Sequence, residues 1–169
     1  QNFINNIVYI MKKLKNEIEY PENITRSDDY SSLEGIFKCS LDSSSIYEKA
    51  IDWGSKFSRD NTSSITFQDE NLKKIIITGF DECSAFPMFG FTSKVQLDFE
   101  ITIQAKDNRY KMIISNTRTL TSSGNWGTLK GYYDVEGQDC INRIWNPAME
   151  VILKLFNEFE QFLTKNEDW

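Results

Sequence analysis

The sequence predicts an α+β domain in which an antiparallel sheet packs against a capped helix and a long C-terminal helix, with a further helix at the N-terminus. The first observation is a strict alternation of apolar and polar residues over 95–106, which is typical of a strand with one buried face. The second is an apolar stripe at helical spacing after Pro147. Burial on one face favours an antiparallel sheet, because parallel sheets are covered on both faces.

The composition is that of one globular domain. The chain has 169 residues, of which 40% are hydrophobic and 26% charged, and it contains 12 Phe, 7 Tyr and 4 Trp. A chain of this length buries roughly 70% of its unfolded surface and needs no disulfide or metal to hold a core. We assign residues 1–32 to an N-terminal helical extension and linker, and residues 33–165 to a single α+β domain.

Charge and residue types exclude several classes of function. The chain contains no histidine, which removes serine–histidine and cysteine–histidine catalysis and imidazole-ligated metals. A net charge of −6 argues against a nucleic-acid partner. No apolar run reaches the roughly 18 residues of a membrane span, and no signal peptide is visible. We expect no metal and no cofactor.

The three cysteines are Cys39, Cys83 and Cys140, which are far apart and form no CxxC pair. A zinc cluster is therefore not expected. Free cysteines are usually buried, and we interpret these as buried thiols. One disulfide with one remaining thiol is the alternative if the chain is exported. A catalytic thiol is disfavoured, because no imidazole is available to activate it.

The N-terminal residues 3–19 carry apolar side chains at intervals of three or four and predict a helix. We favour a helix docked on the domain. A helix on a membrane surface is the alternative, weakened because Glu17 and Glu19 offset the nearby lysines. Pro21 ends this segment, and residues 21–32 are expected to form a polar linker.

A short strand is expected within residues 35–41, followed by a helix that begins at Ser45. Ser45 and Glu48 match a capping box, in which the hydroxyl and the carboxylate satisfy free backbone N–H groups. The buried face of this helix consists of Ile46, Ala50, Trp53 and Phe57. Two β-branched runs around a polar turn, 65–67 and 75–77, then predict a hairpin.

The alternating strand 95–106 is expected to form a second hairpin with residues 109–120. Asp107 and Asn108 between them tolerate the positive φ angles that a tight turn needs. The turn fixes a register that pairs apolar residues: Ala105 with Tyr110, Ile103 with Met112 and Ile101 with Ile114. The same register continues with Phe99 opposite Asn116, Leu97 opposite Arg118 and Val95 opposite Leu120.

This register places Asn116 and Arg118 on the core face. A buried guanidinium is costly unless it is paired. We therefore hypothesise that both residues line a polar-tipped cavity between the sheet and the C-terminal helix, where a ligand carboxylate or amide binds. The alternative is that a β-bulge shifts the register, or that the strand has left the core by this point.

Two loops carry aromatic residues that periodicity does not explain. The glycine-rich loop 121–138 contains Trp126, Tyr132 and Tyr133. The loop 79–93 contains Phe86, Phe89 and Phe91. We hypothesise that the first group forms the rim of a ligand site and the second a partner surface. The alternative for both groups is that the rings cover an open edge of the core.

The last element is a long helix. Asn146 and Pro147 match an N-cap followed by proline at the first helical position. Its apolar stripe consists of Ala148, Val151, Ile152, Leu155, Phe159, Phe162 and Leu163. Residues 140–145 form either a preceding short helix or part of the same helix, kinked at Pro147.

Two short motifs resemble a known family. Ser45 to Ala50 reads S-I-Y-E-K-A, with Trp53 following, and Lys106 to Lys111 reads K-D-N-R-Y-K. They resemble a family of small exported bacterial proteins of unknown function with a TBP-like fold, over about residues 35–120. Asn108 stands where that family usually has glycine, and a tight turn accepts both residues.

The resemblance implies export to the periplasm or cell envelope, and it supplies no enzyme activity and no catalytic residues. The element order is also similar to helix-grip folds, which often hold apolar ligands between a sheet and a helix. We expect a non-enzymatic envelope binding or interaction module, whose partner is a small apolar ligand or an envelope protein. A carboxylate-dependent hydrolase is the alternative, because carboxylates are plentiful, and a purely structural domain is the third.

Overall fold

The computed structural model of the chain describes residues 17–58, 63–88, 91–120, 126–136 and 141–165. Its strands are β1 (Ile24–Arg26), β2 (Ser32–Lys38), β3 (Ile65–Asp69), β4 (Lys74–Met88), β5 (Phe91–Lys106), β6 (Arg109–Leu120) and β7 (Trp126–Thr128). Its helices are α2 (Ser43–Ser55), α3 (Leu129–Glu136) and α4 (Asn146–Thr164), and a π-helical turn, η2 (Ile141–Trp145), leads directly into α4.

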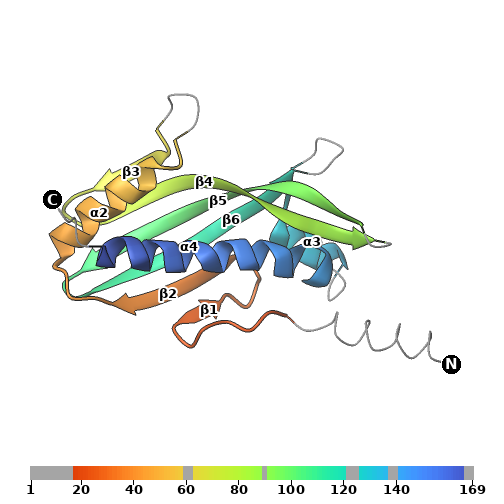
Figure 1. Cartoon of the computed structure of the whole chain (residues 1–169), viewed down its shortest axis with the longest axis horizontal. Helices are drawn as coiled ribbons and strands as arrows, with labels where there is room; N and C mark the ends of the chain where they lie inside the picture. Colours follow the sequence, from red (N-terminus) through yellow and green to blue (C-terminus); the bar gives the residue numbers. More distant parts are fainter. Residues whose placement is uncertain (1–16, 59–62, 89–90, 121–125, 137–140, 166–169) are drawn as a thin grey trace.

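The seven strands of this described part form one antiparallel sheet in the order β1-β2-β6-β5-β4-β3, with β7 also paired to β6. Helices α2 and α4 lie on one face of the sheet, and α3 lies beside the start of α4 (Figure 1). The predicted α+β class, with its antiparallel sheet and long C-terminal helix, is confirmed. In the described ranges, no helix is long and apolar enough to cross a bilayer.

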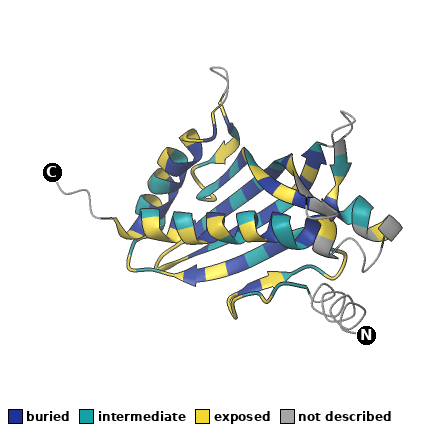
Figure 2. Ribbon diagram, turned by 45° about the vertical axis from the view of Figure 1, so that its right-hand side comes forward, coloured by how far each residue is buried: buried dark blue, intermediate teal, exposed yellow. Residues whose placement is uncertain are grey.

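The predicted strands 95–106 and 109–120 are confirmed, and buried residues alternate with less buried ones along both (Figure 2). The expected loop over residues 79–93 is wrong, because β4 extends to Met88 and β5 begins at Phe91. Cys83 and Ala85 on β4 are buried between exposed Glu82 and Ser84, so the period of two continues there. The many Phe, Pro and Gly residues of this segment hide the alternation in the sequence.

The turn at Asp107 and Asn108 and the first three apolar cross-strand pairs are confirmed, and Asn108 has a φ of 61°. The register then changes at a β-bulge, because Glu100 pairs with Ser115 whereas Asp98 pairs with Arg118. Asn116 lies in this bulge with a φ of 53°.

Beyond the bulge the inward positions are Thr117 and Thr119, which are buried, while Asn116 and Arg118 are exposed. The prediction that Asn116 and Arg118 face the core is therefore wrong. The extra residue of the bulge shifts the alternation by one position, so that Asn116 and Arg118 face away from the core, as the bulge alternative predicted.

Helix α2 begins one turn earlier than predicted. Its N-cap is Asp42, whose carboxylate accepts a hydrogen bond of 2.7 Å from the backbone N–H of Ser45. Serine and aspartate are both good N-caps, so the run from Asp42 to Ser45 offered several starting points. The predicted core face is confirmed. Trp53 packs against Phe159 of α4 with ring centroids 5.0 Å apart.

Helix α4 buries most of the predicted stripe, with Val151 and Phe162 only partly buried. The predicted N-cap at Asn146 is wrong, because η2 continues into α4 and Trp145 at the cap position has helical backbone angles. The side-chain oxygen of Asn146 instead accepts a hydrogen bond of 2.9 Å from the backbone N–H of Ile18. This contact ties the N-terminal segment to the start of α4.

The predicted polar linker over residues 21–32 is wrong for residues 24–26, which form the edge strand β1. Ile24 is buried opposite Gly35, and one apolar residue among polar ones produces no periodic pattern. Of the predicted N-terminal helix, residues 3–16 lie outside the described residues, and residues 17–20 are not helical. Cys83 is a buried free thiol and Cys39 a partly exposed one, whereas Cys140 lies outside the described residues.

Candidate functional site

A pocket of about 120 Å³ lies where β6 changes its partner strand. On one edge of β6, pairing with β2 ends at Ser115, and pairing with β7 begins at Arg118. The bulge at Asn116 occupies the interval between the two partners. The first turns of α3 and α4 close the space from the helical side of the sheet.

The pocket has an apolar interior and a polar rim. Its apolar and aromatic lining consists of Tyr30, Leu33, Ile114, Leu129, Trp145, Met149 and Ile152. Its polar lining consists of Ser31, Ser32, Asn116, Thr117, Thr128 and Lys130. Four separate stretches of the chain contribute: the β1–β2 turn with the start of β2, β6, the β7–α3 junction, and η2 with α4. This combination of apolar lining and a few polar groups is typical of a small-molecule site.

Two residues of the lining have left-handed backbone conformations. Among the described residues, four non-glycine residues have a positive φ: Tyr30, Lys73 and Asn108 lie in hairpin turns, and Asn116 lies in the bulge of β6. Tyr30, with a φ of 58°, and Asn116, with a φ of 53°, both line the pocket. A bulky residue in this region is strained, and strain of this kind concentrates at functional sites.

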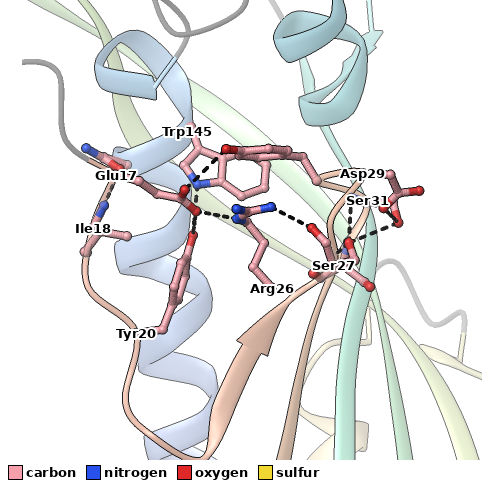
Figure 3. A network of polar contacts seen from close by, with 11 residues as sticks. Glu17, Ile18, Tyr20, Arg26, Ser27, Asp29, Ser31 and Trp145 are labelled. Carbon is pink, nitrogen blue, oxygen red and sulfur yellow. Dashed lines mark hydrogen bonds and ion pairs between the residues drawn. The ribbon is translucent and has the colours of Figure 1, made fainter.

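A polar network contacts the aromatic side chains of the pocket lining, Trp145 and Tyr30 (Figure 3). The indole N–H of Trp145 donates to the hydroxyl oxygen of Tyr20 at 3.0 Å, and the Tyr20 hydroxyl donates to Glu17. Burial first, and then the hydrogen bond to Glu17, raise the pKa of Tyr20 above its ordinary value. Tyr20 therefore stays protonated at neutral pH and serves as donor and acceptor at once.

Arg26 extends this network to Tyr30. Its Nε donates to Glu17 at 2.6 Å, and its guanidinium carbon lies 3.6 Å from the centroid of the Tyr30 ring. The Tyr30 ring in turn meets Trp145 edge to face, with centroids 4.9 Å apart. The two aromatic walls of the pocket are thus fixed by each other and by a partly buried ion pair.

The turn that carries Tyr30 is also held by local hydrogen bonds (Figure 3). Asp29 accepts hydrogen bonds from the backbone N–H and the hydroxyl of Ser31, at 3.1 and 2.6 Å. The hydroxyl oxygen of Ser27 accepts from the backbone N–H groups of Ser31 and Ser32. These contacts stabilise the left-handed conformation at Tyr30.

The lining can bind an apolar group and orient its polar end, but it carries no carboxylate. Lys130 is the one charged residue of this lining, and it forms an ion pair of 2.6 Å with Asp134. The hydrogen bond to Asp134 raises the pKa of Lys130. No group of three or more potential metal ligands occurs within the described ranges.

The structure brings only Asn116, of the five predicted ligand-binding residues, to this pocket. Arg118 lies on the opposite face of the sheet, 3.7 Å from Asp98. Tyr132 packs against the core, whereas Trp126 lies in β7 and Tyr133 in α3 with side chains outside the described part. Phe86 and Phe91 lie on the β4–β5 hairpin with their side chains likewise outside it, and Phe89 is not among the described residues. Their role as a partner surface stays a prediction.

Sequence reasoning missed the aromatic walls of the pocket, Tyr30 and Trp145. Tyr30 is the only aromatic residue of the expected linker 21–32, which was the one available signal. Trp145 lies immediately before the long helix, in residues 140–145, which the sequence predicts as either a short helix or an extension of the long one. Neither residue belongs to a recognisable motif.

Comparisons with known proteins agree with this fold. Residues 36–119 match the family model described as a domain of unknown function, DUF4468, with TBP-like fold. A DUF4468 family protein from Bacteroides ovatus has a similar structure, with a TM-score of 0.67 and 10% identity over 88% of this chain and 94% of that one. A TBP-like protein from Parabacteroides distasonis is similar with a TM-score of 0.64 and 12% identity, over 88% and 98% of the two chains.

At 10% and 12% identity, these two structures establish the fold and no activity. A search of curated proteins finds no match. The motifs around Trp53 and Arg109, which carried the resemblance in the sequence, both lie inside the matched segment. Residues 36–119 therefore match the DUF4468 family of domains, whose fold is TBP-like and whose function is unknown.

Proposed function

We propose that this protein is a binding module whose pocket between β2, β6, α3 and α4 accepts one small apolar group. The observation that carries the proposal is the meeting of two residues with left-handed backbone conformations, Tyr30 and Asn116, from separate segments at one mainly apolar pocket. The network behind Trp145 provides the rigid support that a preformed site requires.

The volume limits the ligand. Pockets for drug-sized molecules measure roughly 300–1,000 Å³. An apolar cavity of about 150 Å³ accepts benzene. At about 120 Å³, this pocket accepts a branched aliphatic or aromatic group of similar size, and not a whole cofactor or acyl chain. The polar body of the ligand would remain at the rim, beside Asn116, Thr128 and Lys130.

Methyl-labelled NMR with benzene as the probe tests this proposal directly. Saturable shifts are expected in methyl groups that line the pocket, among them those of Ile114, Met149 and Ile152. I114F, which fills the pocket, should abolish them, while M149A enlarges the pocket and should admit larger rings such as naphthalene. Thermal unfolding identifies any variant that does not fold.

The chain offers matched controls for both variants. M112A on β6 and I103F on β5 make the same kinds of change at buried positions that do not line the pocket. Both are expected to leave benzene binding unchanged. Absence of saturable shifts in the unmodified protein, or equal loss in I114F and I103F, would contradict the proposal.

We also propose that the protein acts in the cell envelope. The support is the resemblance of its capped-helix and hairpin motifs to exported proteins. Fractionation of the cells that make this chain, followed by immunoblotting, should recover it with envelope markers. Recovery with a cytosolic marker would refute this location. Native mass spectrometry of the envelope material would then measure the mass of any retained ligand.

A further inference from the structure

The face of the sheet that α2 and α4 leave uncovered carries a row of three cations at the β5–β6 hairpin end. Arg109 on β6 lies opposite Lys38 on β2 and, on its other side, opposite Lys106 on β5. Their neighbours Phe37, Ala105 and Tyr110 are buried, so the three cationic side chains project from the uncovered face. Directly opposed like charges destabilise a sheet, so this row needs an explanation.

No carboxylate of the described residues forms an ion pair with this row, which consists of Lys38, Lys106 and Arg109. The next row adds Lys111, which is paired with Glu34 at 2.8 Å. The chain as a whole carries a net charge of −6, so this local positive charge is opposite in sign to the net charge of the protein.

The surface is hollowed at this place. A depression of about 330 Å³ is lined by the side of the hairpin that carries Gln104, Lys106, Arg109 and Lys111. Ile36 on β2 also lines it and is 55% exposed. An exposed apolar side chain between cations provides a contact for the body of a ligand whose charged groups reach the cations.

We propose that this depression binds a small ligand that carries a multiply charged oxyanion of the phosphate or sulfate type. The planar guanidinium of Arg109 can donate two parallel hydrogen bonds to such a group, and Lys38 and Lys106 lie on either side of it. The two unpaired cations of the lining, Lys106 and Arg109, with Lys38 next to Arg109 on β2, match two or more negative charges better than the single charge of a carboxylate. The depression lies on the opposite face from the apolar pocket, so the two proposals stand independently.

Titration of the ¹⁵N-labelled chain with inorganic pyrophosphate, at low ionic strength, tests this inference. Saturable shifts are expected at the amides of Lys38, Lys106 and Arg109. The double variant K106Q/R109Q should weaken binding by about tenfold or more, which corresponds to losing one charge-assisted hydrogen bond. Sulfate and inorganic phosphate, titrated in parallel, determine which oxyanion is preferred.

The control double variant K94Q/K165Q removes the same charge from exposed positions outside the depression. It should bind pyrophosphate with unchanged affinity, and equal weakening in both double variants would show only general electrostatic attraction and overturn the proposal. Absence of saturable shifts would overturn it as well. A DNA duplex that binds more tightly than pyrophosphate, and loses affinity in K106Q/R109Q, would replace the small ligand with a nucleic acid.

Discussion

The indole N–H of Trp145 donates a hydrogen bond to the hydroxyl of Tyr20, across 125 residues of sequence. This contact joins the segment before β1 to the start of α4. Both residues lie outside the matched family segment 36–119, and yet Trp145 forms a wall of the pocket. The pocket thus depends on parts of the chain that flank the family domain.

Replacing Tyr20 with phenylalanine tests this connection. Y20F leaves the indole N–H of Trp145 without its acceptor and Glu17 without one donor. The free energy of unfolding is expected to fall by about 1 kcal/mol, the net value of a typical hydrogen bond. Urea denaturation followed by tryptophan fluorescence measures it.

Y110F is the matched control for that change. The hydroxyl of Tyr110 is buried and has no hydrogen-bond partner among the described residues. Removing an unsatisfied buried hydroxyl is expected to leave stability unchanged or raise it. A loss in Y110F equal to that in Y20F would show that the ring environment, and not the hydrogen bond, determines the effect.

The bulge at Asn116 predicts an unusual order of substitutions. N116G should keep or raise stability, because glycine adopts a positive φ without steric cost. N116V should lower the free energy of unfolding by about 1–2 kcal/mol, because a β-branched residue is strained there. Urea denaturation of both variants measures the order, and equal stabilities would mean that residue 116 does not adopt the left-handed conformation in solution.

Two substitutions at the start of α2 distinguish the observed N-cap, Asp42, from the capping box predicted at Ser45 and Glu48. D42A should lower Tm, because it removes the acceptor of the Ser45 backbone N–H. E48A should leave Tm almost unchanged, whereas a capping box begun at Ser45 requires Glu48. Thermal unfolding by circular dichroism compares the two variants.

The same cap has a defined pH dependence. Hydrogen bonds from the backbone N–H and then the side chain of Ser45 hold the pKa of Asp42 below its usual range. The stabilisation is therefore present above the unfolded carboxyl pKa and is lost as the pH falls through the lower folded value. The difference in Tm between the original chain and D42A should shrink below about pH 4.

The buried thiol of Cys83 predicts a loss of stability in alkaline solution. Burial, followed by the nearby Asp81, raises the pKa of this thiol to about 12. An unfolded thiol ionises near pH ~8.5, so stability is complete below that pH and falls as the pH rises toward the folded value. In C83A, unfolding stability should decline less between about pH 8 and about pH 10 than in the original chain.

The control for that comparison is C39A, which removes a partly exposed thiol. Its urea denaturation curves should show the same alkaline decline as the original chain. An unchanged decline in C83A would mean that other groups cause the effect.

The strongly periodic elements were predictable from the sequence. The alternation of residues 95–106 determined the β5–β6 hairpin and its first pairs, and the stripe of α4 identified the helix that covers the sheet. Both predictions rest on burial of one face, which leaves a repeating trace in the sequence. The family motifs also led to the fold that the comparisons confirm.

The site was largely unpredictable for a physical reason. A bulge shifts the faces by one residue, and its position at Asn116 coincides with the place where β7 replaces β2 beside β6. That arrangement is set by tertiary contacts that leave no period in the sequence. The pocket then combines Tyr30, Leu129 and Trp145, whose positions in the sequence are unrelated.

The change of the strand paired with β6, from β2 to β7, has a consequence for how proteins with this fold diverge. Moving the bulge by two residues would preserve the inward and outward alternation of the strand, because side chains repeat with a period of two. It would displace the opening by about 6.8 Å along β6. The position of the opening would therefore change with the position of one irregularity on one strand, while the aromatic core around Phe159 stays as it is.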